Sequence, residues 1–359
     1  MAYLKIYPSR IIQNIRKIND LMKKHDKQWS LVTKVLGGHK KTLEKIMQSD
    51  AILDTHSIAD SRVSNLRVIK GINKDIVTMY LKPPAKSYVK SVVKYADISL
   101  NTDYSTIIAL NEEAKQQNKN HRIIIMIEMG ELREGVVREK FLDFYEKIFN
   151  LSNVKVMGLG TNLGCMYGIE PTYDKLIQLS LYEQLIEIRF KKDINMISGG
   201  SSITLPLLKK GKLPKKVNHL RIGEAVFLGT TPLTNKKFGN LSTNAFEFLA
   251  NIVELEKKEN IPDGVIGEGN VGHAEMTEEE KIKMEYKALV DFGVVDVNNE
   301  YLNPKDKNVN FLGTTSDLTV YNIGTKIKKY STGKTLSFQP NYMAVAQLMN
   351  SKYITKNIA

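Results

Sequence analysis

Short apolar runs rich in β-branched residues alternate with longer amphipathic stretches rich in lysine and glutamate from about residue 10 to about residue 230. This alternation is typical of repeated strand–helix units. Eight runs are predicted to be strands: Trp29–Lys34, Ala51–Asp54, Ile76–Tyr80, Ile98–Leu100, Arg122–Glu128, Lys155–Gly160, Ile194–Ser198 and His219–Arg221. All but the last precede a segment long enough for a helix. The count favours a (β/α)8 TIM barrel over an open sheet, so the predicted fold class is α/β.

The pattern changes after Gly229. From Thr231 onward helix-length periodicity is scarce, and Asn, Gly and Pro turns separate short strand-like runs. These runs are Ala245–Glu254, Tyr286–Val295 and Thr319–Ile323, and Leu4–Tyr7 is a further strand-like run outside the barrel repeat. We therefore predict the barrel at residues 11–230 and a C-terminal, mainly β domain at residues 231–359. Residues 1–10 are predicted to supply a strand that pairs with that domain.

Composition places this 359-residue chain among ordinary globular proteins, because 42% of its residues are hydrophobic and 25% are charged. The net charge of +13 is spread along the chain, which favours lysines on helix surfaces over a nucleic-acid-binding stripe. The single cysteine cannot form an intramolecular disulfide, and six scattered histidines give no metal-binding motif. No apolar signal core is evident, and no apolar run approaches the ~20 residues of a membrane span. We expect a cytoplasmic protein that binds no nucleic acid, membrane or metal.

Lys34 closes the first predicted strand, in Leu31-Val32-Thr33-Lys34-Val35. In barrels of this kind the loops at the carboxyl ends of the strands form the active site. Partial desolvation there favours the neutral amine, which makes Lys34 a candidate for Schiff-base chemistry. The competing interpretation is a lysine that extends from a strand end into water, and this strand alone favours that interpretation.

Two glycine-containing loops follow the last two predicted strands. Ser198-Gly199-Gly200-Ser201-Ser202 follows strand seven, and Arg221-Ile222-Gly223-Glu224-Ala225 follows strand eight. Successive amides and hydroxyls at a helix start can bind a phosphate, and barrels usually hold phosphate after these two strands. Either loop alone is equally compatible with a plain turn. Together, and opposite a lysine on strand one, they indicate a phosphate-bearing ligand.

These segments resemble the alanine racemase family of pyridoxal-phosphate enzymes, most closely its ornithine racemase-like branch. Val32-Thr33-Lys34-Val35 resembles the strand of the cofactor lysine, and Glu128-Met129-Gly130-Glu131-Leu132-Arg133-Glu134-Gly135 resembles the arginine segment after strand five. Gly160-Thr161-Asn162-Leu163-Gly164 is similar to the strand-six motif, with Asn162 in place of a histidine.

The resemblance implies a role for each of these segments. Lys34 would carry pyridoxal 5'-phosphate and act as a base, and Arg133 would contact the phenolic oxygen and the substrate carboxylate. Arg221 would face the pyridine nitrogen. Because a guanidinium keeps its proton, the ring would stay unprotonated and be a weaker electron sink, which favours removal and return of the Cα proton over transamination. The implied cofactor-binding set is Lys34, Asn162, Ser198, Gly199, Gly200, Ser201, Arg221, Gly223 and Glu224.

Two tyrosines of alanine racemases are missing from this chain. The partner subunit's catalytic tyrosine aligns with Val294, so the base opposite Lys34 has no identified counterpart. Asp296, Ser316, Asp317 and Tyr342 are candidates for that base or for substrate contacts, and each is at least as readily explained as structural. The phosphate-contacting tyrosine is replaced by Gly37-Gly38-His39, where His39 could substitute.

Loss of two bulky side chains should admit a substrate longer than alanine. The resemblance agrees, and implies a basic amino acid such as ornithine or lysine, whose distal ammonium could pair with Glu131, Glu170 or Asp296. Cys165 is interpreted as a small buried residue.

We therefore expect an amino-acid racemase that acts on a free amino acid and forms a head-to-tail homodimer with shared active sites. The alternatives are a D-amino-acid aldolase or lyase, which would need a metal site, and a non-catalytic pyridoxal-phosphate protein, which would end with the barrel. A nucleic-acid binder would show a salt-sensitive shift of duplex or single strand.

Overall fold

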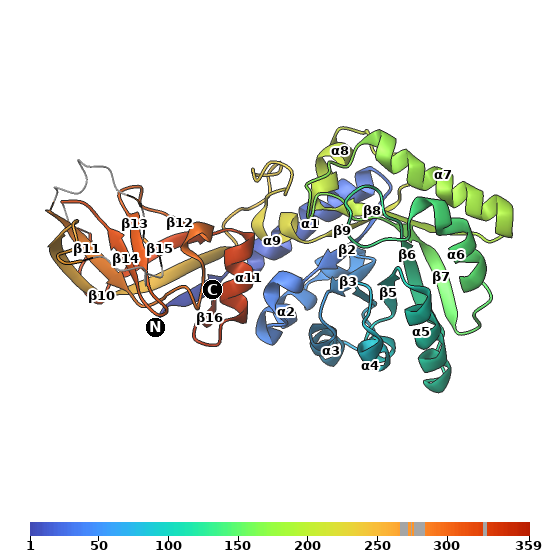
Figure 1. Ribbon diagram of the computed structural model, residues 1–359, viewed down its shortest axis with the longest axis horizontal. Coiled ribbons are helices and arrows are strands. Elements are labelled where there is room, and N and C mark those ends of the chain that lie inside the picture. Colours follow the sequence, from blue (N-terminus) through green and yellow to red (C-terminus); the bar gives the residue numbers. More distant parts are fainter. Residues whose placement is uncertain (266–271, 274, 276–283, 326–328) are drawn as a thin grey trace. The chain divides into compact units, whose positions relative to one another are not determined.

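The chain forms two compact units in the computed structural model, which describes residues 1–265, 272–273, 275, 284–325 and 329–359 (Figure 1). The larger unit spans Ser9–Thr243, and the smaller combines Met1–Pro8 with Asn244–Ala359. None of the helices in the described ranges has the length and apolarity needed to cross a membrane.

Eight parallel strands form a closed barrel in the larger unit, which confirms the predicted TIM barrel (Figure 1). The strands are β2 (Gln28–Val32), β3 (Ser57–Asp60), β4 (Thr78–Tyr80), β5 (Ile98–Asn101), β6 (His121–Met126), β7 (Val154–Gly160), β8 (Met196–Ser201) and β9 (His219–Ile222). The helices are α1 (Pro8–Lys24), α2 (Lys40–Met47), α3 (Val63–Ile72), α4 (Val89–Tyr95), α5 (Tyr104–Gln116), α6 (Phe141–Ile148), α7 (Tyr173–Phe190), α8 (Leu205–Lys209) and α9 (Glu224–Leu228). β2 closes the barrel by pairing with β9, where Leu31 lies opposite Ile222.

The barrel strands are held by apolar packing, because most of their residues are fully buried. Val32, Met79, Ile124 and Met126 belong to one buried cluster that joins strands around the barrel. Burial of such side chains stabilises the fold by about 1.5–3 kcal/mol each.

The predicted second strand, Ala51–Asp54, is wrong. Residues Asp50–Asp54 form a 3-10 helix, because the Ser49 side chain accepts a hydrogen bond from the Ala51 amide and caps its start. The strand is Ser57–Asp60 instead, and both polar residues at its ends are buried. A four-residue strand with buried polar ends lacks the apolar signature on which the prediction depended.

The smaller unit contains an antiparallel sheet, in the order β12-β15-β10-β11-β14-β13 (Figure 1). Its strands are β10 (Phe246–Glu259), β11 (Met284–Val290), β12 (Leu302–Pro304), β13 (Asn310–Thr314), β14 (Thr319–Asn322) and β15 (Thr335–Pro340). β1 (Tyr3–Ile6) pairs with β10 and with β16 (Thr355–Ile358), and α11 (Tyr342–Asn350) follows β15. Four aromatic rings form its core: Phe248, Phe292, Tyr321 and Phe338.

Residues 230–243 fall in the barrel unit, so the structural division lies at Thr243 rather than near residue 230. Asn14 on α1 accounts for much of this attachment. Its side chain accepts a hydrogen bond from the Ser242 amide at 2.7 Å and donates to the Ser242 carbonyl at 2.9 Å. The segment therefore returns to the barrel's first helix before the chain enters the sheet.

Candidate active site

Lys34 begins a 3-10 turn just beyond the end of β2, at the carboxyl end of the barrel. The buried Asp60 carboxylate at the end of β3 anchors this turn, since it accepts hydrogen bonds from the Thr33 hydroxyl at 3.1 Å and the Asn65 side chain at 3.1 Å. Burial raises the pKa of Asp60, and these hydrogen bonds oppose that rise. The Lys34 side chain is exposed, so the barrel does not provide the partial desolvation that we expected.

The loop after β6 presents Arg133 and Glu134. It closes on itself where the Glu128 amide donates to the Val136 carbonyl at 3.0 Å. Gly135 permits this closure: its φ is +152°, and a Cβ there would lie 2.3 Å from the Glu128 nitrogen. The two charged residues therefore occupy the tip of a short loop whose two ends are tied together.

Four site residues form a continuous chain of hydrogen bonds. The Arg133 guanidinium donates to both Glu134 carboxylate oxygens, through Nε and, at 2.6 Å, through Nη2. The Asn162 amide nitrogen also donates to Glu134, and the Asn162 oxygen accepts from Arg221. The loops after β6 and β7 and the strand β9 are thereby connected. Glu134 was not among the predicted site residues.

Arg221 is buried and contacts the neighbouring strand β8 and the end of β7 beyond it. Its guanidinium donates to the Thr161 carbonyl at 2.8 Å and to the Ser198 hydroxyl. Burial lowers the pKa of Arg221 to about 10, with Glu134 acting in the opposite direction. A pKa near 10 still leaves the side chain charged at neutral pH.

A line of buried, hydrogen-bonded polar side chains continues from Ser198 through the barrel strands. The buried His219 ring bridges the Ser198 hydroxyl at 2.9 Å and the Ser30 hydroxyl at 2.8 Å. Burial holds the pKa of His219 well below its usual range. This histidine is therefore neutral, and it supports Ser198 from the side opposite Arg221.

Glu131 anchors the loop after β7. Its buried carboxylate accepts hydrogen bonds from five backbone amides, those of Gly164, Cys165, Met166, Tyr167 and Ile169. Burial alone would raise the pKa of Glu131, but these amides lower it to about 2. The prediction that Glu131 could pair with a substrate ammonium is therefore not supported, because its oxygens already hold the loop.

Cys165 is exposed, so the prediction of a buried cysteine is wrong. The Cys165 amide is bound by Glu131, while its thiol faces Arg133. Glu170 farther along the loop is also exposed. His39, the possible phosphate contact, lies at the start of α2 and its ring hydrogen bonds to the Thr42 hydroxyl at 2.8 Å.

The two predicted phosphate loops meet through Ser202, which was not in the predicted set of ligands. Its hydroxyl accepts hydrogen bonds from the amides of Gly223 at 3.3 Å and Ala225 at 3.2 Å. Gly200 makes the first loop possible, since its φ is +123° and a Cβ would lie 2.4 Å from the Thr204 hydroxyl oxygen. All four predicted residues of this segment, Ser198, Gly199, Gly200 and Ser201, belong to β8 itself.

Glu224 lies near Lys34, as expected from the pairing of β2 with β9. Its half-buried carboxylate accepts a hydrogen bond from the Thr230 hydroxyl at 3.0 Å. Burial raises the pKa of Glu224, and the Lys34 charge lowers it. The predicted lysine and the predicted phosphate loop therefore occupy adjacent positions on the barrel rim.

Asp296, Ser316 and Asp317 lie together in the smaller unit. The Val295 amide donates to the Ser316 carbonyl at 3.2 Å, which joins the two turns that carry them. Asp296 accepts a hydrogen bond from the Ser351 hydroxyl at 2.9 Å, and Ser316 donates to Asp317 at 2.8 Å. Tyr342 is the first residue of α11 in the same unit.

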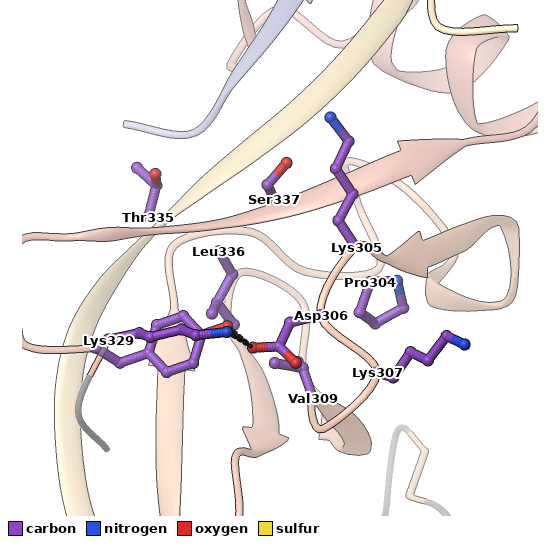
Figure 2. A pocket seen from close by; sticks show the side chains of 10 residues that line it. Pro304, Lys305, Asp306, Lys307, Val309, Lys329, Thr335, Leu336 and Ser337 are labelled. Carbon is purple, nitrogen blue, oxygen red and sulfur yellow. Dashed lines mark hydrogen bonds and ion pairs between the residues drawn. The ribbon is translucent and has the colours of Figure 1, made fainter. Parts of the chain in front are cut away.

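A hollow of about 450 Å³ lies in the smaller unit, and Figure 2 shows side chains that line it. Lys305, Lys329 and Asp306 are among the residues that line it, and none of the predicted site residues does. Lys329 pairs with Asp306 at 3.6 Å, and Lys305 pairs with Glu247 at 2.5 Å. Because none of the predicted site residues lines this hollow, we place the candidate site at the barrel rim. In the described part of the chain, no three His, Cys, Asp or Glu side chains are grouped as metal ligands.

Comparison with known proteins gives one consistent result. The family model "Alanine racemase, N-terminal domain" matches residues 6–231. Ornithine racemase from Acetoanaerobium sticklandii is 30% identical over 98% of this chain and 97% of its own length. Lysine racemase from Thermotoga maritima is 29% identical over 98% of both chains.

The fold agrees with this result. The crystal structure of alanine racemase from Corynebacterium glutamicum superposes with a TM-score of 0.74 at 15% identity, covering 100% of this chain and 99% of that one. The chain therefore belongs to the alanine racemase family.

Proposed function

We propose that this protein is a pyridoxal-phosphate-dependent racemase of a basic amino acid such as ornithine or lysine. This proposal rests mainly on the arrangement at the barrel rim. The carboxyl ends of the strands bring together Lys34, the amides after β9 and the hydrogen-bonded chain Arg133–Glu134–Asn162–Arg221. Similarity along nearly the whole chain to an ornithine racemase and a lysine racemase supports the choice of substrate class.

The residues at the rim fit this cofactor. The Ser202 hydroxyl oxygen accepts hydrogen bonds from the amides of Gly223 and Ala225, so its own O–H is oriented by them and could be donated to a phosphate. Lys34 lies on the neighbouring strand end, where its amine could reach an aldehyde attached to a ligand held there. Arg221 would face the ring nitrogen. When bound, pyridoxal phosphate would delocalise the electron pair left at Cα after proton removal.

Each residue has a chemical task in this proposal. The Lys34 amine takes the Cα proton on one face of the substrate and returns a proton there in the reverse direction. Arg133 binds the substrate carboxylate. Arg221 donates a hydrogen bond to the ring nitrogen but keeps its own proton, so the ring nitrogen stays unprotonated. This would limit transamination, the competing reaction.

The distal ammonium of the substrate needs an acidic partner. Because Glu131 is committed to backbone amides, Glu170 and Asp296 are the remaining predicted partners. The base on the opposite face is unassigned, with Asp296, Ser316, Asp317 and Tyr342 as predicted candidates.

We also propose a head-to-tail homodimer in which each active site receives residues from both subunits. Light scattering on a sizing column would show twice the 40.7 kDa chain mass. A mass of one chain at working concentration would contradict this proposal. The cytoplasmic location and the lack of nucleic-acid binding stay predictions.

The test of function starts from purified protein loaded with pyridoxal phosphate. L-ornithine, L-lysine and L-alanine are incubated separately, and chiral chromatography follows each D-enantiomer. We expect conversion of a basic amino acid, loss of conversion in Lys34→Ala, and retention in Lys41→Ala, an exposed lysine on α2.

Two outcomes would contradict the proposed function. Bound cofactor with no enantiomer exchange for any amino acid would refute racemisation. A 2-oxo acid formed in place of the D-enantiomer would instead indicate loss or transfer of the amino group.

A further inference from the structure

Glu134 is an anion placed between two cations at the barrel rim. One carboxylate oxygen accepts from Arg133 Nε, and the other accepts from Arg133 Nη2 at 2.6 Å and from the Asn162 side chain. Only 16% of the Glu134 side-chain surface is exposed, compared with 33% for Arg133. The pair is therefore bidentate and partly shielded from water, the geometry in which a charge pair holds a fixed orientation.

The contacts of Asn162 fix the orientation of its amide. Glu134 can only accept a hydrogen bond and Arg221 can only donate one. The Asn162 nitrogen must therefore face Glu134 and its oxygen must face Arg221, as the structure has them. The Glu134 carboxylate thus determines the direction in which Asn162 presents its acceptor to Arg221.

The charge arrangement also needs this carboxylate. Arg133 and Arg221 lie close enough for the Arg133 charge to lower the pKa of Arg221, in addition to the larger effect of burial. Glu134 acts in the opposite direction on Arg221, and it directly neutralises Arg133. Without it, two guanidinium groups would face each other beside a site that must also admit a substrate ammonium.

We propose that Glu134 is a positioning residue for the proposed racemisation. It holds the Nε edge of the Arg133 guanidinium, which directs the remaining edge toward the substrate carboxylate, and it fixes Arg221 through Asn162. This assignment rests on the proposed function, in which Arg133 binds that carboxylate. Glu134 itself touches neither substrate nor cofactor.

The experiment compares holoenzymes of the wild type, Glu134→Ala, Glu134→Gln and the control Glu139→Ala, whose exposed carboxylate lies five positions farther along the chain. In Glu134→Ala we expect a rise in KM and a loss of about 100-fold in kcat/KM, the effect of misplacing a substrate-positioning group by about 1 Å. Glu134→Gln keeps the shape but not the charge, and should also raise KM.

Restoring the activity of Glu134→Ala with a small anion would distinguish a positioning role of Glu134 from a general loss of structure. Formate can occupy the space vacated in Glu134→Ala and bridge Arg133 to Asn162, so it should restore kcat/KM at least about tenfold. Formate should leave Glu139→Ala unchanged. An unchanged KM in Glu134→Ala, or a loss that formate does not alter, would overturn the proposal.

A binding measurement keeps this inference distinct from the proposed function. Pentanoate has the carboxylate and chain length of ornithine but no amine, so it tests Arg133 without any turnover. Calorimetry should show at least about tenfold weaker pentanoate binding in Glu134→Ala than in the wild type. Equal pentanoate affinity in the two proteins would count against Glu134, whereas a wild type that binds pentanoate and racemises nothing would count only against the proposed function.

Discussion

Replacing Glu131 with glutamine should destabilise the barrel unit in a strongly pH-dependent way. The native carboxylate accepts five backbone hydrogen bonds, which the neutral amide cannot reproduce because its NH2 group would face the same N–H donors. The substitution keeps the volume of the side chain. The expected change therefore comes from lost hydrogen bonding and charge rather than from a cavity.

The size of the effect follows from the pKa of Glu131. The folded protein lowers it from an ordinary value of 4.5 to about 2. Each pKa unit corresponds to about 1.4 kcal/mol, so the buried carboxylate contributes about 3 kcal/mol to stability at neutral pH. Because the folded pKa lies below the unfolded one, this contribution is complete above about pH 5 and is lost as the pH falls toward 2.

Trp29 provides the assay, because it is the only tryptophan and is buried in β2 of the barrel. Urea unfolding followed by Trp29 fluorescence gives the free energy of unfolding at each pH for the wild type and Glu131→Gln. The difference should be about 3 kcal/mol at pH 7 and should shrink between pH 4.5 and pH 2. His121, whose pKa burial lowers to about 4, acts equally in both proteins and cancels.

Glu139→Gln is the matched control, since that carboxylate is exposed. It should differ from the wild type by less than about 0.5 kcal/mol at every pH. A Glu131→Gln protein as stable as the wild type at pH 7, or a difference that stays constant down to pH 2, would refute the reasoning.

Two further changes test the rim. Gly135→Ala should lower the free energy of unfolding by about 1–3 kcal/mol in the same urea assay, because its Cβ would meet the Glu128 nitrogen. The substitution should also reduce kcat/KM, because it displaces the loop that carries Arg133. An alanine variant with native kinetics would show that this loop closure is dispensable. Ser202→Ala should weaken pyridoxal-phosphate binding about tenfold in an absorbance titration, since it removes the hydroxyl to which the Gly223 and Ala225 amides donate. Equal affinity of the variant and the wild type for pyridoxal phosphate would argue against a phosphate at this position.

The barrel was predictable because its strands are short, apolar and evenly spaced among amphipathic helices. β6, for example, reads His121–Met126 with four consecutive buried apolar residues at its end. β3 escaped detection because the buried residues at its two ends, Ser57 and Asp60, are polar. Interior polar residues become understandable only through their partners on other strands, which the order of residues along a chain does not reveal.

The same limit applies to the site. Motifs at strand ends single out Lys34, Arg133 and Arg221. No motif in the sequence selects Glu134, and Glu131 is predicted only as a partner for a substrate ammonium. Their tasks depend on which loops meet: Glu134 reaches Asn162 after β7, and Glu131 reaches the amides that follow it. The exposure of Cys165 was missed for the same reason, because the Glu131 carboxylate that binds its backbone amide comes from a different loop.

The contacts described for the rim of the barrel all lie within residues 9–243. The cationic groups are thus set in place by the barrel's own loops, before any other part of the protein is considered. For protein engineering, the Glu131 and Glu134 contacts should therefore be kept intact when the rest of the chain is redesigned, because they belong to the barrel unit itself.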